Sequence, residues 1–183
     1  MATARPAPAD PSTPRLELDR FLPYRLNVLA ALTSDGVARL YSRQFGVSIP
    51  EWRIVATLGE HVKLTAHAIG AHSHMHKTKV SRAVGDLISR GVVRREINKD
   101  DLREAFLSLT AEGRAIYEGI APLALSYEVR LVEGLNDVER AAVNDAVATL
   151  TRRSRALLDE IKREQAKGGK QDPAAPPARL RDS

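Results

Sequence analysis

The side chains with the clearest potential for chemistry are cations, and they gather in one segment of the chain. Between Lys77 and Arg103 there are eight Lys or Arg residues against four Asp or Glu residues, a net charge of +4, while the whole 183-residue chain carries +5. Positive charge at this density suits an anionic partner such as the phosphate backbone of a nucleic acid. The chemistry that this segment favours is electrostatic binding.

Some of these cations fall on one side of a helix predicted from about His76 to Arg90. Val80, Val84, Leu87 and Ile88 recur at helical spacing and would face the core. The opposite side then presents donors and cations where base edges and phosphates would lie, namely His76, Lys77, Thr78, Lys79, Ser81 and Arg82. A merely solvated helix face is the plainer explanation of such a pattern.

A β-hairpin is predicted directly after this helix, and it is the only strand signal in the chain. Residues on either side of the polar turn from Asn98 to Asp101 alternate between apolar and polar. Cations at Arg94, Arg95, Lys99 and Arg103 make the hairpin a narrow ribbon able to enter a minor groove. Two short helices followed by such a ribbon are typical of a winged helix-turn-helix, which favours DNA contact over a solvated face.

Histidines form a second candidate cluster, because all five lie within sixteen residues: His61, His67, His72, His74 and His76. Imidazole is a common zinc ligand. The last three alternate with period two through a predicted turn between helices, where no helix would place them on one side, and the chain has no cysteine to complete a usual set. Surface or phosphate-contacting histidines are therefore favoured, and no metal or other cofactor is assigned.

Several other classes of protein are disfavoured. The chain lacks a glycine-rich phosphate loop, a nucleophile elbow and an acid pair with a plausible pocket, so we do not expect an enzyme. The absence of cysteine excludes disulfides and thiol-based sensing. No apolar stretch is long enough to cross a bilayer, and no signal peptide is recognisable, so we expect a soluble cytoplasmic protein.

Long helices are predicted on both sides of the central unit. The first opens at Pro23 and closes near Gly46, and a shorter helix with the Ser48-x-x-Glu51 capping pattern follows. Thr65 is expected to cap a third helix and Thr110 a fifth, and a sixth begins after Asn136. The first and sixth carry apolar stripes with no obvious partner in one subunit, which favours an intertwined dimer.

The resulting fold class is mainly α with a small β-hairpin wing: a winged helix-turn-helix between long N- and C-terminal dimerisation helices. Residues 1–15 are predicted to be a disordered N-terminal tail, and residues 166–183 a disordered basic C-terminal tail. The single domain between them, residues 16–165, places dimerisation helices at about 16–46 and 111–165. The winged unit occupies about 48–110.

An ordered set of residues across the central unit resembles the MarR family of bacterial regulators. The set comprises Lys79-Val80-Ser81-Arg82-Ala83-Val84, Leu87, Gly91-Val92-Val93-Arg94-Arg95, and then Asp101, Arg103, Leu107, Leu109, Thr110 and Gly113 at the family's spacing. The resemblance covers roughly Phe21 to Ile161. It implies a transcriptional regulator that binds double-stranded DNA at a pseudo-palindromic operator as a homodimer held by its terminal helices.

The same resemblance implies roles for two residues of the wing and shows two departures from the family. Arg103 is the minor-groove residue and Asp101 orders the wing by pairing with an arginine, although an ordinary turn residue is the alternative for Asp101. Leu102 stands where the family often has Arg, which removes one wing cation. His76 stands where Ser or Asp is common, which is expected to leave the recognition helix without its usual cap.

Regulation by a small molecule is implied as well, because family members are commonly released from DNA by aromatic acids. Pro50-Glu51-Trp52-Arg53 is similar to the branch that controls aromatic-acid breakdown, some of whose members respond to aromatic coenzyme A thioesters. Tyr24, Arg25, Trp52 and Tyr117 would supply an apolar wall and an anion-binding cation. A plain core role for Trp52 is the alternative.

The expected function is thus a homodimeric repressor released from its operator by an aromatic acid or its thioester. Two alternatives remain open. One is a metal-responsive DNA-binding regulator that uses the histidine cluster. The other is a non-specific architectural protein that binds DNA through its basic tail.

Overall fold

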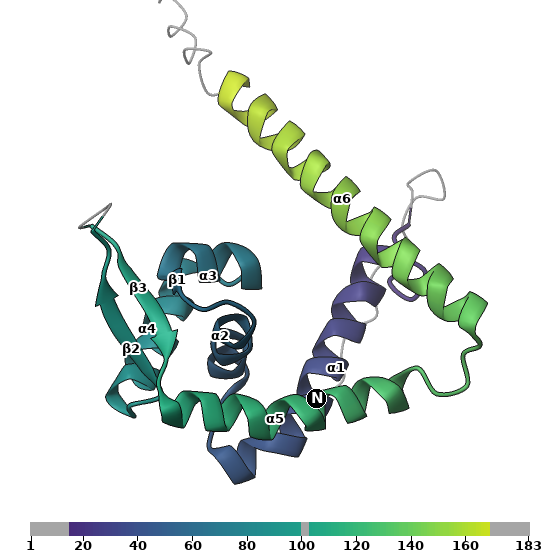
Figure 1. Cartoon of the computed structure of the whole chain (residues 1–183). Helices are drawn as coiled ribbons and strands as arrows, with labels where there is room; N and C mark the ends of the chain where they lie inside the picture. Colours follow the sequence, from purple (N-terminus) through teal and green to yellow (C-terminus); the bar gives the residue numbers. More distant parts are fainter. Residues whose placement is uncertain (1–14, 100–102, 169–183) are drawn as a thin grey trace, which may run out of the picture. The chain divides into compact units, whose positions relative to one another are not determined.

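The structure, a computed structural model, describes residues 15–99 and 103–168. The chain divides into two compact units, one ending at Leu131 and the other beginning at Val132. The first unit holds five helices and a small sheet among its described residues, and the second holds one long helix (Figure 1). The mainly helical architecture with a small sheet confirms the predicted fold class.

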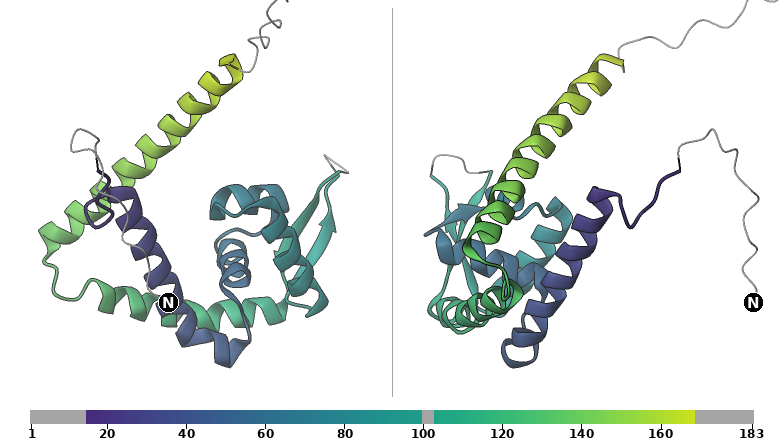
Figure 2. Two further views of the ribbon diagram at one scale, coloured as in Figure 1. Left: turned by 180° about the vertical axis from the view of Figure 1, so that it is seen from behind. Right: turned by 90° about the vertical axis from the view of Figure 1, so that its right-hand side faces the viewer.

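Five helices build the first unit. They are α1 (Leu22–Phe45), α2 (Ile49–Glu60), α3 (Ala66–Ser73), α4 (Lys77–Ser89) and α5 (Ala111–Leu131). All five agree with the predicted helices to within a few residues at each end. In both Figure 1 and Figure 2, α5 begins beneath the β-sheet and continues beside α1, which packs against it. The buried core lies between α2, α4, α5 and the sheet, with Ile54, Leu58, Leu87, Leu107 and Ile120 at its centre.

The sheet contains three strands rather than two. Strands β2 (Val93–Ile97) and β3 (Ala105–Leu109) form the predicted antiparallel hairpin, and β1 (Leu64–Thr65) pairs with the other edge of β3. The prediction that the hairpin holds the only strand was therefore wrong. A two-residue strand shows no alternation of its own, and β1 is defined by its partner β3, more than forty residues further along the chain.

Side-chain caps hold three of the helix starts where the sequence predicts them. Thr65 accepts a hydrogen bond from the N–H of Ala68 (3.2 Å), and the Thr110 hydroxyl accepts one from the N–H of Gly113 (3.1 Å). At the start of the last helix, Asn136 and Glu139 each accept a hydrogen bond from the other's backbone N–H. These caps satisfy N–H groups that the first turn of a helix leaves without a partner.

The second unit consists mainly of α6 (Asp137–Gly168). Its apolar residues are exposed in the single chain, including Val143, Val147, Leu157, Leu158 and Ile161. In the first unit α1 likewise exposes Leu22, Leu26, Leu29 and Leu32. None of the described helices is both long and apolar enough to span a membrane.

Candidate nucleic-acid interface

Helices α3 and α4 are joined by a tight turn. His74 adopts the left-handed conformation (φ 51°, ψ 33°) that ends α3, and the next residue, Met75, is buried. The backbone N–H of Met75 donates to the carbonyl of Gly70 over 3.2 Å, which closes the turn. This turn fixes the start of α4 relative to α3, as a helix-turn-helix requires.

Helix α4 has one buried face and one exposed face. Val80, Ala83, Val84 and Leu87 are buried at helical spacing against α2, α3 and β2. All the predicted base- and phosphate-contacting side chains of this helix are exposed: His76, Lys77, Thr78, Lys79, Ser81 and Arg82. The structure therefore presents the predicted reading face of α4 to solvent as one surface, and assignment of these residues to DNA contact remains a proposal.

The N-terminus of α4 has a histidine cap and no acidic residue in its first turn. His76 is its N-cap, and its Nδ1 accepts a hydrogen bond from the N–H of Thr78 over 3.4 Å. The usual Ser or Asp cap is absent, as expected, and the imidazole nitrogen of His76 serves as the acceptor in its place. No acidic residue lies in the first turn, so the positive end of the helix dipole beside Lys77 is not compensated by a carboxylate of that turn.

The two arginines of β2 lie on opposite faces of the ribbon. Arg94 pairs with Ser108 across the strands, and its Nε donates to the Ser108 hydroxyl (3.0 Å) and to Glu96 Oε1 (3.1 Å). Arg95, the next residue, turns to the other face, since side chains alternate along a strand. The charge of Arg94 is thus partly neutralised by Glu96 on the outer face, whereas Arg95 faces α4.

A hollow of about 820 Å³ lies between α3, α4 and the wing. It is lined by Lys77 and Ser81 from α4 and by Arg95 and Arg103 from the wing. Residues from two separate predicted elements are therefore brought around one concave surface. Lys99 is exposed at the far end of the ribbon.

Two predictions for the wing concern residues that the structure does not describe. Asp101, assigned the wing-ordering role, and Leu102, the missing wing cation, lie outside the described residues. Arg103 is exposed and precedes β3 by two residues. The minor-groove role of Arg103 and the pairing of Asp101 with an arginine stay predictions.

Arg90 links α4 to α2, a contact that sequence reasoning did not predict. Its Nη1 donates to Glu51 Oε1 (2.9 Å) and to the Gly46 carbonyl (3.0 Å), joining the end of α4 to the start of α2. The other oxygen of Glu51 accepts from the backbone N–H of Ser48 (2.7 Å). Nothing in the sequence signals this pair, because its members lie 39 residues apart.

The predicted effector residues fall into two groups. Trp52 packs between Tyr41 and Tyr117, with ring centroids 5.7 and 6.3 Å away. Tyr24 and Arg25 are exposed near the start of α1. Since Tyr41 lies seventeen residues further along the same helix, Tyr24 is about 25 Å from it along the axis. Within one protomer the structure does not bring Tyr24 and Arg25 beside Trp52.

Tyr41 is the one described group with a clearly perturbed acidity. Burial raises its pKa to about 12, while nearby Arg53 lowers it and nearby Glu51 raises it. Its ring is buried against Trp52. Tyr41 therefore remains protonated throughout the physiological range.

Comparison with known proteins finds a match to one family model over part of the chain. Residues 45–104 match the model of the MarR family. The matched residues contain α2, α3, α4 and β2, which include the helix-turn-helix and the first strand of the wing. No curated protein matches the sequence.

Solved structures with the same fold are MarR regulators. A MarR/EmrR family transcriptional regulator from Acinetobacter sp. ADP1 is 25% identical, with a TM-score of 0.68, over 79% of this chain and 99% of that one. A MarR family regulator from Silicibacter pomeroyi DSS-3 is also 25% identical, with a TM-score of 0.66, over 75% and 98% of the two chains. The fold also matches a putative MarR family regulator from Listeria monocytogenes complexed with a 26mer DNA, with 14% identity, a TM-score of 0.71, and coverage of 79% and 95%.

Proposed function

We propose that this chain is a transcriptional regulator of the MarR family, whose model residues 45–104 match, and that it is a homodimeric repressor of a pseudo-palindromic operator. An aromatic acid or its coenzyme A thioester releases it from the DNA. Members of this family are regulators and not enzymes.

One observation carries the DNA-binding part of this proposal. The exposed face of α4 and the face of the wing that carries Arg95 meet around the same hollow, whose lining includes Lys77 from α4 and Arg95 and Arg103 from the wing, beside Glu104 and apolar residues. A recognition helix in the major groove and a ribbon in the adjacent minor groove need this juxtaposition. The Listeria protein, solved with DNA, has the same fold.

The dimer part rests on apolar surface. The stripe on α1 includes Leu29 and Leu32, which are 53% and 64% exposed, and α6 exposes a second stripe around Val147. Contiguous apolar surface of this kind marks an interface in a soluble protein. A two-fold dimer buries both stripes and sets two copies of α4 at the separation of successive major grooves, about 34 Å.

The effector part rests on the aromatic group around Trp52. Its rings offer stacking surface, and the Arg114 guanidinium lies 5.6 Å from the Tyr117 ring centroid, so a cation is close to that surface. An aromatic carboxylate needs an apolar wall and a cation together. Tyr24 and Arg25 enter this site only if a partner subunit supplies them.

Substitutions on α4 test the DNA-binding part. We expect Arg82→Ala or Lys79→Ala to weaken operator binding by about 1–3 kcal/mol if the side chain reads a base, with a smaller loss on random DNA. Arg43→Ala, an exposed cation at the end of α1, is the matched control and should bind as the parent does. Equal affinity of the parent for operator and random DNA would instead indicate an architectural protein.

A DNA-release assay tests the effector. Aromatic acids and their coenzyme A thioesters are added to the protein–operator complex while Trp52 fluorescence is followed. We expect release together with quenching, since the tryptophan is unique in the chain. If no aromatic compound releases the DNA, this part of the proposal is rejected, while the operator-binding result stands by itself.

A further inference from the structure

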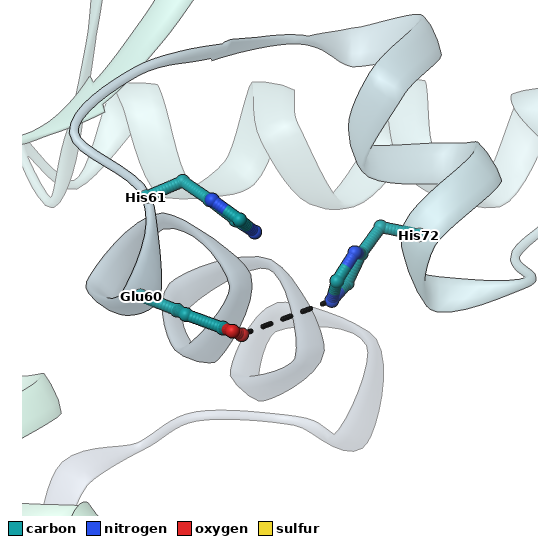
Figure 3. A group of neighbouring side chains, drawn as sticks. All are labelled: Glu60, His61 and His72. Atoms are coloured by element: carbon teal, nitrogen blue, oxygen red, sulfur yellow. Dashed lines mark ion pairs between the residues drawn. The ribbon is translucent and has the colours of Figure 1, made fainter.

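Three potential metal ligands meet where α2 joins α3, apart from the DNA-binding face. Glu60 is the last residue of α2, His61 follows as its C-cap, and His72 lies in the last turn of α3. Figure 3 shows the three side chains turned toward one another. One ligand atom from each lies within 4.8 Å of the others.

The ligand atoms of this group already lie close to one another. His72 Nε2 is 3.9 Å from Glu60 Oε2, and the rings of His61 and His72 meet edge to face with centroids 5.3 Å apart. Hydrogen bonds at the end of α2 and at the start of α3 fix the backbone near these residues. The His61 N–H donates to the Thr57 carbonyl (3.1 Å), and Thr65 caps the start of α3.

Two imidazoles and one carboxylate select a particular class of ion. Calcium and magnesium prefer all-oxygen sites, whereas zinc takes two histidines and a glutamate with bonds of about 2.0–2.2 Å. Tetrahedral bonds of that length place ligand atoms about 3.4 Å apart. The side chains of Glu60 and His72 are 67% and 49% exposed, so they have room to rotate and close the remaining gap of about 1.4 Å.

We propose that Glu60, His61 and His72 form a binding site for Zn²⁺. The sequence argument against metal considered His72 together with His74 and His76. In the structure His74 forms the turn and His76 caps α4. The histidine that lies beside His72 is instead His61. The ion cross-links the end of α2 to the last turn of α3 and closes the segment containing β1.

A bound ion should therefore stabilise the winged unit. An ion that binds the folded state and not the unfolded one raises the melting temperature in proportion to the logarithm of its concentration over its Kd. This expectation depends only on the site. It holds or fails independently of operator binding and of the aromatic effector.

Calorimetric titration of Zn²⁺ into the untagged, EDTA-treated, full-length protein tests the site. We expect one ion per chain and a higher melting temperature with zinc. His61→Ala and His72→Ala should each lower the affinity at least ~10-fold, because even loss of an outer-shell partner commonly has that effect. His72→Gln provides a second variant if His72→Ala unfolds.

Two other histidines of the same segment serve as matched controls. His67→Ala alters an exposed residue of α3, and His74→Asn keeps a side chain that tolerates the left-handed turn. Both should bind zinc as the parent does. Absence of saturable binding, wild-type affinity in the His61 and His72 variants, or an equal loss in the controls would each overturn the proposal.

Discussion

Arg94 and Arg95 lie on opposite faces of the wing, and we therefore expect their substitutions to change DNA affinity by different amounts. Arg95 lines the hollow with Lys77, whereas Arg94 on the other face pairs with Glu96 and Ser108. Arg95→Ala and Arg94→Ala each remove one positive charge, so the long-range attraction of DNA falls equally in both. Any difference between the variants then reports a direct contact.

The loss of DNA-binding free energy expected for Arg95→Ala follows from what one arginine contributes at each half-site of the operator. An arginine that reads a base edge is worth about 1–3 kcal/mol. A dimer presents two copies far apart, so the losses add to about 2–6 kcal/mol, or at least ~30-fold in Kd. If Arg95 contacts a phosphate instead of a base, the slope of log K against log salt should become shallower by about 2, because each subunit leaves one phosphate without its cation.

Arg94→Ala should have a much smaller effect on DNA affinity. The side chains of Arg94 and Glu96 are 64% and 38% exposed, and an ion pair this close to solvent contributes at most about 1 kcal/mol to stability. Fluorescence anisotropy with a labelled operator at low and at moderate salt measures both variants. Equal losses of affinity would refute the assignment of the inner face of the wing to DNA.

Two further predictions concern stability. A Cβ at Gly113 would overlap the Val92 carbonyl oxygen, whereas one at Gly85 meets nothing within 4 Å. In urea unfolding, Gly113→Ala should therefore lower the free energy of unfolding by about 1–3 kcal/mol. Gly85→Ala should raise it by about 0.5–1 kcal/mol. An unchanged stability of Gly113→Ala would contradict the close packing of α5 against Val92. Because the folded pKa of Tyr41 is about 12 and an unfolded tyrosine titrates near 10, the unfolded state loses its proton first, and the free energy of unfolding should fall by about 1.4 kcal/mol from pH 9 to 11. Tyr41→Phe should remove that part of the pH dependence; a variant with the same slope as the parent would show that Tyr41 is not held protonated.

Features encoded locally were predictable from the sequence. The buried stripe of α4 repeats at helical spacing, and the caps at Thr65, Thr110 and Asn136 act within three residues of themselves. The exposed reading face then follows, because the side of a helix opposite its core must meet solvent. The hairpin was predictable for the same reason, since its turn and its strands are adjacent.

Features that depend on packing between distant segments were not predictable. Strand β1 exists only through β3, and Arg90 reaches Glu51 only when α4 lies on α2. His61 and His72 meet because α3 folds back on the end of α2. No periodicity along the chain reports such contacts, which arise from tertiary structure.

The effector residues illustrate the same limit. Trp52 and Tyr117 are in contact because α2 and α5 pack together, and their role in effector binding stays a prediction. Tyr24 and Arg25 were placed with them by residue type alone, and the length of α1 keeps them apart within one chain. Residue type suggests which chemistry is available, whereas helix length decides whether the groups can meet.

The central claim, sequence-specific DNA binding by paired recognition helices, is tested most directly by selecting bound duplexes from a random DNA library with the full-length protein. The account predicts a two-fold symmetric consensus whose half-sites are centred about 10 base pairs apart. Binding to it should be at least ~10³-fold tighter than to random DNA of the same length. Repeated rounds that enrich no consensus, or that enrich a single asymmetric half-site, would contradict the account.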